Sequence, residues 1–197
     1  MSEALPAGSV IRKLWMTESA NYLNHLLRLD PDSRHARFGG GISDEFLRSY
    51  ADRTFRLSAT IHGFFVDGVL RVAAELRPFG PGFTREAEVA FSIENPWQSH
   101  GIGSALLERT LLVARNRGIK TLHMACLASN RRMQELARKF AADLSFDFGS
   151  VVGEVSAPQP TPLSVLRELL ADNHGFATAV LEVQSRLLNR AISESPR

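Results

Sequence analysis

The chain has 197 residues, 44% of them hydrophobic and 22% charged, with a formal net charge of +2, as in one globular domain or one domain with an appendage. The positive charge is small and dispersed, which argues against nucleic acid as the main partner. The chain has no apolar run of about 18 residues, the length that would predict a membrane span. The single cysteine, Cys126, excludes an internal disulfide framework. The N-terminal residues lack a basic segment followed by an apolar stretch, so we expect a cytoplasmic protein.

The N-terminal part of the chain predicts a short strand followed by two helices. The strand covers residues 10–14, and the first helix begins near Thr17 with a stripe of leucines on one face. We expect this helix to end at Pro31, because proline is poorly accommodated inside a helix. Residues 33–41 are predicted as a loop closed by three glycines, and Ser43 is expected to cap the second helix.

The middle of the chain predicts three strands. Residues 55–66 and 69–77 are expected to pair, because Asp67-Gly68 between them is a strong hairpin signal. A loop rich in proline and glycine follows. Residues 86–93 then form a third strand, which leads directly into a glycine loop.

The rest of the domain alternates between helix and strand. A helix over 103–117 is stopped by Gly118, a strand covers 120–127, and a second helix covers 131–141. Residues 143–155 predict a last hairpin. This order of elements predicts a mixed α/β (α+β) sheet protein.

The composition changes after residue 156. A proline-rich linker over 157–162 separates a domain of residues 1–156 from a helical extension over 163–197, which we expect to be interrupted near Gly175. The extension has an apolar face too large to leave in water, so it should pack on the domain or on a partner, for example as a homodimer. This face consists of Val165, Leu166, Leu169, Leu170, Val180, Val183, Leu187 and Leu188.

The most specific functional signal is the glycine loop between strand 86–93 and the next helix. Such a loop presents backbone N–H groups at the positive end of a helix, where a pyrophosphate can bind. Gly101 and Gly103 permit unusual backbone angles and allow a phosphate to approach closely. A Walker loop would need a lysine after the last glycine, and a dinucleotide fingerprint would need a third glycine near Leu106. The sequence has neither, so both of these phosphate-binding motifs are excluded.

The pattern Gln-x-x-Gly-x-Gly over residues 98–103, after an Ala-Glu-Val strand, resembles the coenzyme A loop of the GNAT N-acetyltransferases. A second block resembles that family's Asn-x-x-Ala-x-x-Leu-Tyr helix at Asn130 and Leu136. The resemblance covers about residues 10–156. It implies the GNAT fold with an extra C-terminal helical tail, acetyl-CoA as cosubstrate without a metal, and direct acetyl transfer to a primary amine. The acceptor would be a protein lysine or a small amine.

The resemblance also implies roles for individual residues. Glu88 matches by position the strand glutamate that serves as general base in the family's histone-type enzymes, although such a carboxylate can also bind substrate or face solvent. Asn130 is either a cofactor contact, a plain helix cap, or both. The residues expected to bind the cofactor are Phe91, Ser92, Ile93, Gln98, Ser99, His100, Gly101, Ile102, Gly103, Ser104 and Asn130.

The sequence departs from the family pattern where a general acid is expected. The family's tyrosine falls at Ala137, and the chain's two tyrosines, Tyr22 and Tyr50, lie in the predicted N-terminal helices. A non-catalytic acyl-CoA-binding sensor is therefore the alternative function, and an interaction protein whose tail docks on a partner is a second one. The remaining histidines are scattered without metal-site spacing, and His123 is predicted to be structural.

Overall fold

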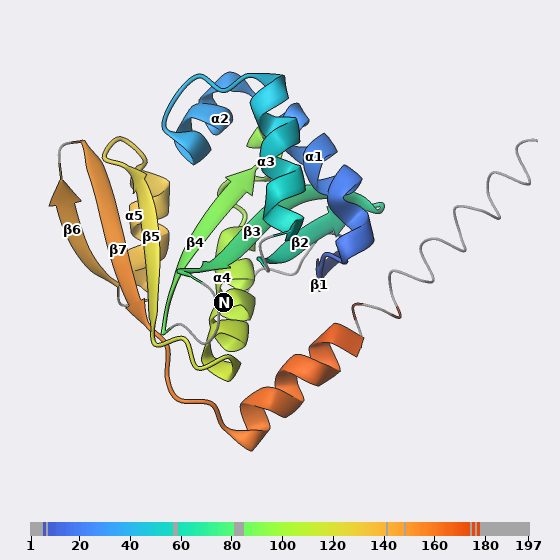
Figure 1. Ribbon diagram of the computed structural model, residues 1–197, viewed down its shortest axis with the longest axis vertical. Helices are drawn as coiled ribbons and strands as arrows, with labels where there is room; N and C mark the ends of the chain where they lie inside the picture. The colour runs from blue at the N-terminus through green and yellow to red at the C-terminus, as the bar shows by residue number, and fades with distance from the viewer. Residues whose placement is uncertain are drawn as a thin grey trace, which may run out of the picture.

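The computed structural model of the protein describes residues 6, 8–56, 59–80, 85–140, 142–147, 149–173, 175 and 177. In these residues one seven-stranded sheet has the order β1-β2-β3-β4-β5-β7-β6. Helices cover both of its faces (Figure 1). The predicted mixed α/β fold is confirmed.

All neighbouring strands of the sheet are antiparallel except β4 and β5, which are parallel. The β2–β3 hairpin turns at the predicted Asp67-Gly68, with φ of 47° and 65° at these two residues. Two successive positive φ angles match the right-handed twist of the flanking strands. The strands are β1 (Ser9–Lys13), β2 (Thr60–Val66), β3 (Val69–Pro78), β4 (Glu86–Ile93), β5 (Thr121–Leu127), β6 (Asp143–Asp147) and β7 (Ser150–Ser156).

The helices enclose one apolar core on each face of the sheet. The core under α4 and α5 includes Phe64 and Leu106, and the core under α1 and α3 includes Leu26 and Phe65, all fully buried. The α-helices are α1 (Ser19–Arg28), α2 (Pro31–Phe38), α3 (Asp44–Arg56), α4 (Ile102–Asn116) and α5 (Arg131–Lys139), with short 3-10 turns at Met16–Glu18 and Asn95–Trp97.

Pro31 begins a helix instead of ending one, so the loop predicted over 33–41 is wrong at residues 33–38. α1 already stops at Arg28, and the carboxylate of Asp30 then caps α2 by accepting a hydrogen bond from Ser33 N at 2.9 Å. Proline suits the first helical position because the N–H that it lacks would be unpaired there. Gly39, with φ of 78°, ends α2.

The strand predicted over 55–66 is also too long, because α3 continues to Arg56 and β2 starts only at Thr60. Phe55 packs edge-on against Tyr22 of α1, with ring centroids 6.0 Å apart. Its apolar side chain therefore belongs to the buried stripe of a helix and not to a strand.

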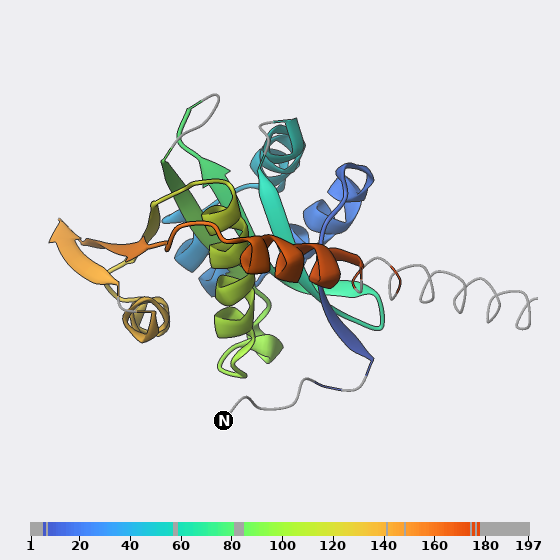
Figure 2. The ribbon, with the colours of Figure 1, turned by 90° about the horizontal axis from the view of Figure 1, so that it is seen from below.

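After the linker, residues 162–173 form a helix, which we call the tail helix, and Gly175 and Ala177 are helical as well. The interruption predicted near Gly175 is thus absent at these two residues. The tail helix crosses α4 (Figure 2). Residues 178–197, which include the apolar positions 180, 183, 187 and 188, lie outside the described residues. No helix of the described part is long and apolar enough to cross a membrane.

Candidate active site

The site lies where β4 and β5 separate. Their parallel pairing consists of three register pairs, the last of which is Glu88↔His123, and beyond it the two strands diverge (Figure 1). On its other side β4 stays paired with β3 as far as Val72↔Ile93. The second half of β4 therefore turns one hydrogen-bonding edge toward the opening, where an extended ligand can pair with it as an added strand.

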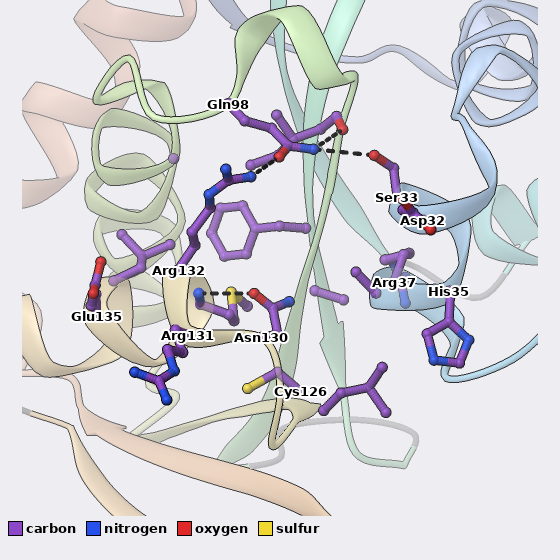
Figure 3. A pocket seen from close by; sticks show the side chains of 18 of the residues that line it. Asp32, Ser33, His35, Arg37, Gln98, Cys126, Asn130, Arg131, Arg132 and Glu135 are labelled. Atoms are coloured by element: carbon purple, nitrogen blue, oxygen red, sulfur yellow. Dashed lines mark hydrogen bonds between the residues drawn. The ribbon is translucent and has the colours of Figure 1, made fainter.

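A pocket with a volume of about 1070 Å³ fills this opening. That volume is at the upper end of the usual range for small-molecule and cofactor sites, roughly 300–1,000 Å³. Its walls come from β4, the glycine loop, the end of β5 and most of the residues of α2 and α5. Figure 3 shows α2 on one side of the pocket and α5 on the other.

The glycine loop ends at the first turn of α4. Gly101 is the N-cap residue of α4, with φ of 74° and no side-chain hydrogen bond to cap the helix. This backbone conformation favours glycine. At Gly103 an added Cβ would lie 3.5 Å from Leu136 Cδ2, an ordinary contact, so packing alone does not require glycine there. The first N–H groups of α4, which lack partners within the helix, thus begin at the pocket wall.

Basic side chains of α5 lie beside the loop. Lys139 Nζ donates to Ser104 Oγ at 3.0 Å, and Arg132 donates to the side-chain oxygen of Gln98. Both basic residues line the pocket, together with Arg131. Their charges add to the positive end of α4 at one end of the pocket, which suits a ligand with several phosphate groups.

The side chain of Gln98 joins the loop to the opposite wall. Its Nε2 donates to Ser33 Oγ of α2 at 3.1 Å and to the carbonyl oxygen of Ile93 at 3.4 Å, while its oxygen accepts from Arg132 (Figure 3). One side chain therefore connects α2, the end of β4 and α5 across the pocket.

Most of the residues predicted to bind a cofactor line the pocket, and three do not. Ser92 is buried under α1, where its Oγ lies 2.9 Å from His25 Nε2. Ile102 is buried in the core below α4, and His100 is exposed. Those that line the pocket are Phe91, Ile93, Gln98, Ser99, Gly101, Gly103, Ser104 and Asn130.

Asn130 caps α5 and also lies in the wall of the pocket. Its Oδ1 accepts a hydrogen bond from Met133 N at 3.1 Å, so it is the N-cap of α5, and it also lines the pocket. The prediction of a helix cap is confirmed.

Glu88 also lines the pocket, and Arg77 Nη1 lies 3.7 Å from its Oε2. Its side chain is 32% exposed, so it is open to a ligand or water. Glu86, two residues earlier on the same strand, is not among the residues that line the pocket. It lies 3.0 Å from His123 Nε2, so the ring of His123 has a polar partner, and His123 does not line the pocket.

The two tyrosines are part of a buried cluster around Glu75 of β3. Tyr22 and Tyr50 donate their hydroxyl groups to Glu75 Oε2 at 2.9 and 2.7 Å, and Arg37 donates to the same oxygen at 3.1 Å. Arg77 donates to Oε1. Burial raises the pKa of both tyrosines, and neither lines the pocket. They hold α1 and α3 on the sheet and are not placed to protonate a leaving thiolate.

Two further residues bear on the chemistry. Ala137, at the position of the family's tyrosine, is 2% exposed and is not among the residues that line the pocket. Cys126 does line the pocket, but burial raises the pKa of its thiol, which makes it a poor nucleophile. Within the described ranges, no group of three or more His, Cys, Asp or Glu side chains is placed to hold a metal ion.

The wall formed by α2 was missed in the sequence. It contributes Asp30, Asp32, Ser33, His35 and Arg37 to the pocket lining. The signal was present in the chain, since an aspartate before a proline and a glycine after residue 38 are common boundaries of a short helix.

Comparison with known proteins agrees with this geometry. Residues 26–142, more than half of the chain, match the family model described as "Acetyltransferase (GNAT) family". The chain is similar to the GNAT domain of S. lividans PAT, with 23% identity and a TM-score of 0.65 over 75% of this chain and 90% of that one. It is also similar to yncA from Salmonella typhimurium, solved with its cofactor acetyl-CoA, with 14% identity and a TM-score of 0.61 over 79% and 97%.

A third similar structure is the PaiA N-acetyltransferase from Thermoplasma acidophilum in complex with coenzyme A. It has 18% identity and a TM-score of 0.58 over 75% of this chain and 98% of that one. At these identities the likeness shows a shared fold.

Proposed function

The chain belongs to the GNAT acetyltransferase family, and from this we propose that it transfers the acetyl group of acetyl-CoA directly to a primary amine. The observation that carries the proposal is the open edge of β4, which leads to a glycine loop at the start of α4. The edge would pair with the pantetheine arm. The loop, with Arg132 and Lys139 beside it, would bind the pyrophosphate.

In the proposed reaction the amine nitrogen attacks the thioester carbon, the new C–N bond forms, and the C–S bond breaks. The leaving thiolate takes up the second proton that the nitrogen loses as the amide forms, directly or through water, and departs as coenzyme A. Glu88 accepts the proton of the incoming ammonium, directly or through a water. A backbone N–H group near the end of β4, within Phe91–Ile93, stabilises the charge on the thioester oxygen. The raised pKa of Cys126 supports direct attack over an acyl-enzyme at this thiol.

The acceptor in this proposal is a protein lysine or a small amine that approaches between α2 and β4. Asp32 of α2 and Glu88 of β4 line the same pocket as the thioester position proposed above. Their carboxylates favour a cationic amine over a neutral or anionic acceptor.

Thiol release measured with a panel of lysine peptides, polyamines and aromatic amines tests the proposal, with mass spectrometry of each acceptor. Acceptor-dependent release of coenzyme A together with a newly acetylated nitrogen supports the transferase. The alternative, an acyl-CoA-binding sensor, is favoured by Ala137 in place of the family's tyrosine. Calorimetric binding of acetyl-CoA without transfer to any acceptor would support that sensor and overturn the proposal.

Gly101→Asp should weaken acetyl-CoA binding at least about tenfold, which is roughly 1.4 kcal/mol. The substitution strains a residue with φ of 74° and adds a negative charge against the proposed pyrophosphate site. Gly118→Asp is the matched control, because Gly118 has the same φ of 74° but lies just beyond the other end of α4. Calorimetric titration should show weakened binding for the first variant alone, and equal affinities in two folded proteins would refute the loop assignment.

A further inference from the structure

His25 of α1 is completely buried against β4, and both of its ring nitrogens have polar partners. Its Nδ1 lies 3.1 Å from Glu94 Oε1, and its Nε2 lies 2.9 Å from Ser92 Oγ and 3.2 Å from the carbonyl oxygen of Ser92. The exposed fraction is 0% for His25, 2% for Ser92 and 6% for Glu94. His25 therefore holds the two residues on either side of Ile93, which lines the pocket.

The partners of the His25 ring indicate where its proton lies. The carboxylate of Glu94 also accepts from Arg28 at 2.9 Å and from Arg71 at 3.0 Å. Burial alone would raise the pKa of this carboxyl, but its hydrogen bonds to His25 and the two arginines lower it. An ionised carboxylate only accepts hydrogen bonds, so Nδ1 of His25 carries the proton. Burial lowers the pKa of His25, and in the neutral ring Nε2 accepts from the hydroxyl of Ser92.

The backbone of β4 turns Ile93 toward the pocket. Glu94 N donates to Arg71 O of β3 at 3.2 Å, and the register between the two strands is regular from Val72↔Ile93 onward. Because successive residues of a strand direct their backbone groups to opposite sides, Ile93 directs its N–H and C=O away from β3 and toward the opening. Its carbonyl oxygen accepts there from Gln98 Nε2 at 3.4 Å, which agrees with this direction.

The peptide group between Ser92 and Ile93 connects the held side of β4 to the open side. Its carbonyl oxygen belongs to Ser92 and lies beside the His25 ring. In a planar trans peptide the C=O and the N–H point in opposite directions, so whatever fixes the carbonyl of Ser92 also fixes the direction of the N–H of Ile93. That N–H is one of the backbone groups proposed above to stabilise the charge on the thioester oxygen.

We propose that His25 is a positioning residue for acetyl transfer, and that its hold on Ser92 and Glu94 aims the N–H of Ile93 at the thioester oxygen. This role rests on the proposed function, since it concerns the same thioester. A donor that is aimed in advance needs no reorganisation during the reaction, and loss of one such donor lowers kcat roughly 10²- to 10³-fold in enzymes generally. An apolar side chain at position 25 could pack α1 on the sheet, but it could not orient a hydroxyl group or a carboxylate.

His25→Phe tests this role, because it keeps an aromatic ring and removes both hydrogen bonds. Its turnover should fall at least about tenfold while its affinity for acetyl-CoA, set mainly by the glycine loop, stays within about twofold of wild type. His25→Gln should keep turnover within about threefold, because its amide offers one donor and one acceptor like the neutral ring. Thiol release measures turnover, and calorimetry measures the affinity.

Infrared difference spectroscopy of bound acetyl-CoA, labelled with carbon-13 at the thioester carbonyl, reports the position of the N–H directly. The C=O band should move to higher wavenumber in His25→Phe than in wild type, because a misaimed donor polarises the bond less. Ser92→Ala, which removes only the hydroxyl group, should shift the band in the same direction and serves as the second variant if His25→Phe does not fold.

Tyr22→Phe is the matched control. Tyr22 lies on the same helix, is 1% exposed, and donates to Glu75 Oε2 of β3 at 2.9 Å, so this variant also loses one buried hydrogen bond between α1 and the sheet. It should be less stable than wild type but have the same C=O band and turnover. A band shift in Tyr22→Phe as large as that in His25→Phe would show that loosening of α1 is the cause, and would overturn the role of His25.

An unshifted band in a folded His25→Phe or Ser92→Ala protein with bound acetyl-CoA would also overturn this role, and would leave acetyl transfer untouched. The band needs no acceptor. A protein that transfers acetyl to no amine but shows the shift would therefore refute the transferase while supporting the hold of His25 on the Ile93 N–H.

Discussion

Glu88→Gln is expected to lower turnover about 10²- to 10⁴-fold and to leave acetyl-CoA affinity unchanged. The amide keeps the shape of the side chain but cannot accept the proton of the incoming ammonium. The ion pair with Arg77 is long, at 3.7 Å, and its carboxylate is about one-third exposed, so its loss should change stability little. Thiol release under saturating acetyl-CoA measures turnover, and calorimetry measures the affinity.

Glu86→Gln provides the matched control for this experiment. Glu86 lies on the same strand, its side chain is 59% exposed, and it is paired with His123. This variant should keep wild-type turnover. The loss of turnover in Glu88→Gln should become smaller at high pH, because more of the amine is then already deprotonated. A folded Glu88→Gln protein with near-wild-type turnover at neutral pH would rule out Glu88 as the base.

Glu75→Gln is expected to destabilise the fold by roughly 3–5 kcal/mol, the usual cost of removing one partner from a buried ion pair. Glu75 is 2% exposed, and its carboxylate faces the guanidinium groups of Arg37 and Arg77. Without it, the charge of Arg37, whose side chain is only 10% exposed, stays in the interior without a counter-charge. Urea unfolding followed by circular dichroism measures the difference.

The pH dependence of this effect has a definite sign. Burial alone would raise the pKa of Glu75, but the charges of Arg37 and Arg77 outweigh it and lower the pKa below 4.5. Such a group stabilises the folded state above the pKa of the unfolded chain, and this contribution is lost as pH falls through the folded pKa. The difference in free energy of unfolding between the wild type and Glu75→Gln should therefore become smaller at acidic pH.

Asp52→Asn is the control for the stability experiment, because it breaks an exposed ion pair with Arg56 and should cost no more than about 1 kcal/mol. A Glu75→Gln protein as stable as Asp52→Asn would show that the buried cluster does not hold the helices on the sheet. If the difference in free energy of unfolding between wild type and Glu75→Gln did not depend on pH, the charge of Glu75 would not be the cause of the lost stability.

The glycine loop at the start of α4 could be predicted from the sequence because all of its signals are local. The alternation of residues 86–93, the glycines at 101 and 103 and the periodicity of the following helix each specify a neighbouring piece of backbone. The α2 wall was missed because proline can follow the end of one helix or occupy the first turn of another, and the leucine stripe before Pro31 favoured the first of these interpretations. The hydrogen bond from Ser33 N to the carboxylate of Asp30, which decides between these meanings, is visible only in three dimensions.

The cluster around Glu75 could not be predicted from local patterns. Tyr22 and Tyr50 are 53 and 25 residues away from Glu75 along the chain, and only the packing of α1 and α3 on β3 brings their hydroxyl groups to one carboxylate oxygen. For the same reason, the side of the tail helix that contacts α4 could not be predicted. Leucine spacing predicts an apolar face but does not say which side of the helix contacts α4.

Gln98 offers a physical link between the two halves of the proposed reaction. Its side chain is hydrogen-bonded at the same time to Arg132 beside the glycine loop and to Ser33 on the wall where the acceptor is proposed to enter. If bound acetyl-CoA draws Arg132 away, the bond to Ser33 changes with it. Any factor by which the cosubstrate then alters the affinity for the amine must equal the factor by which the amine alters the affinity for acetyl-CoA. The coupling between the two substrates would thus pass through a single amide side chain.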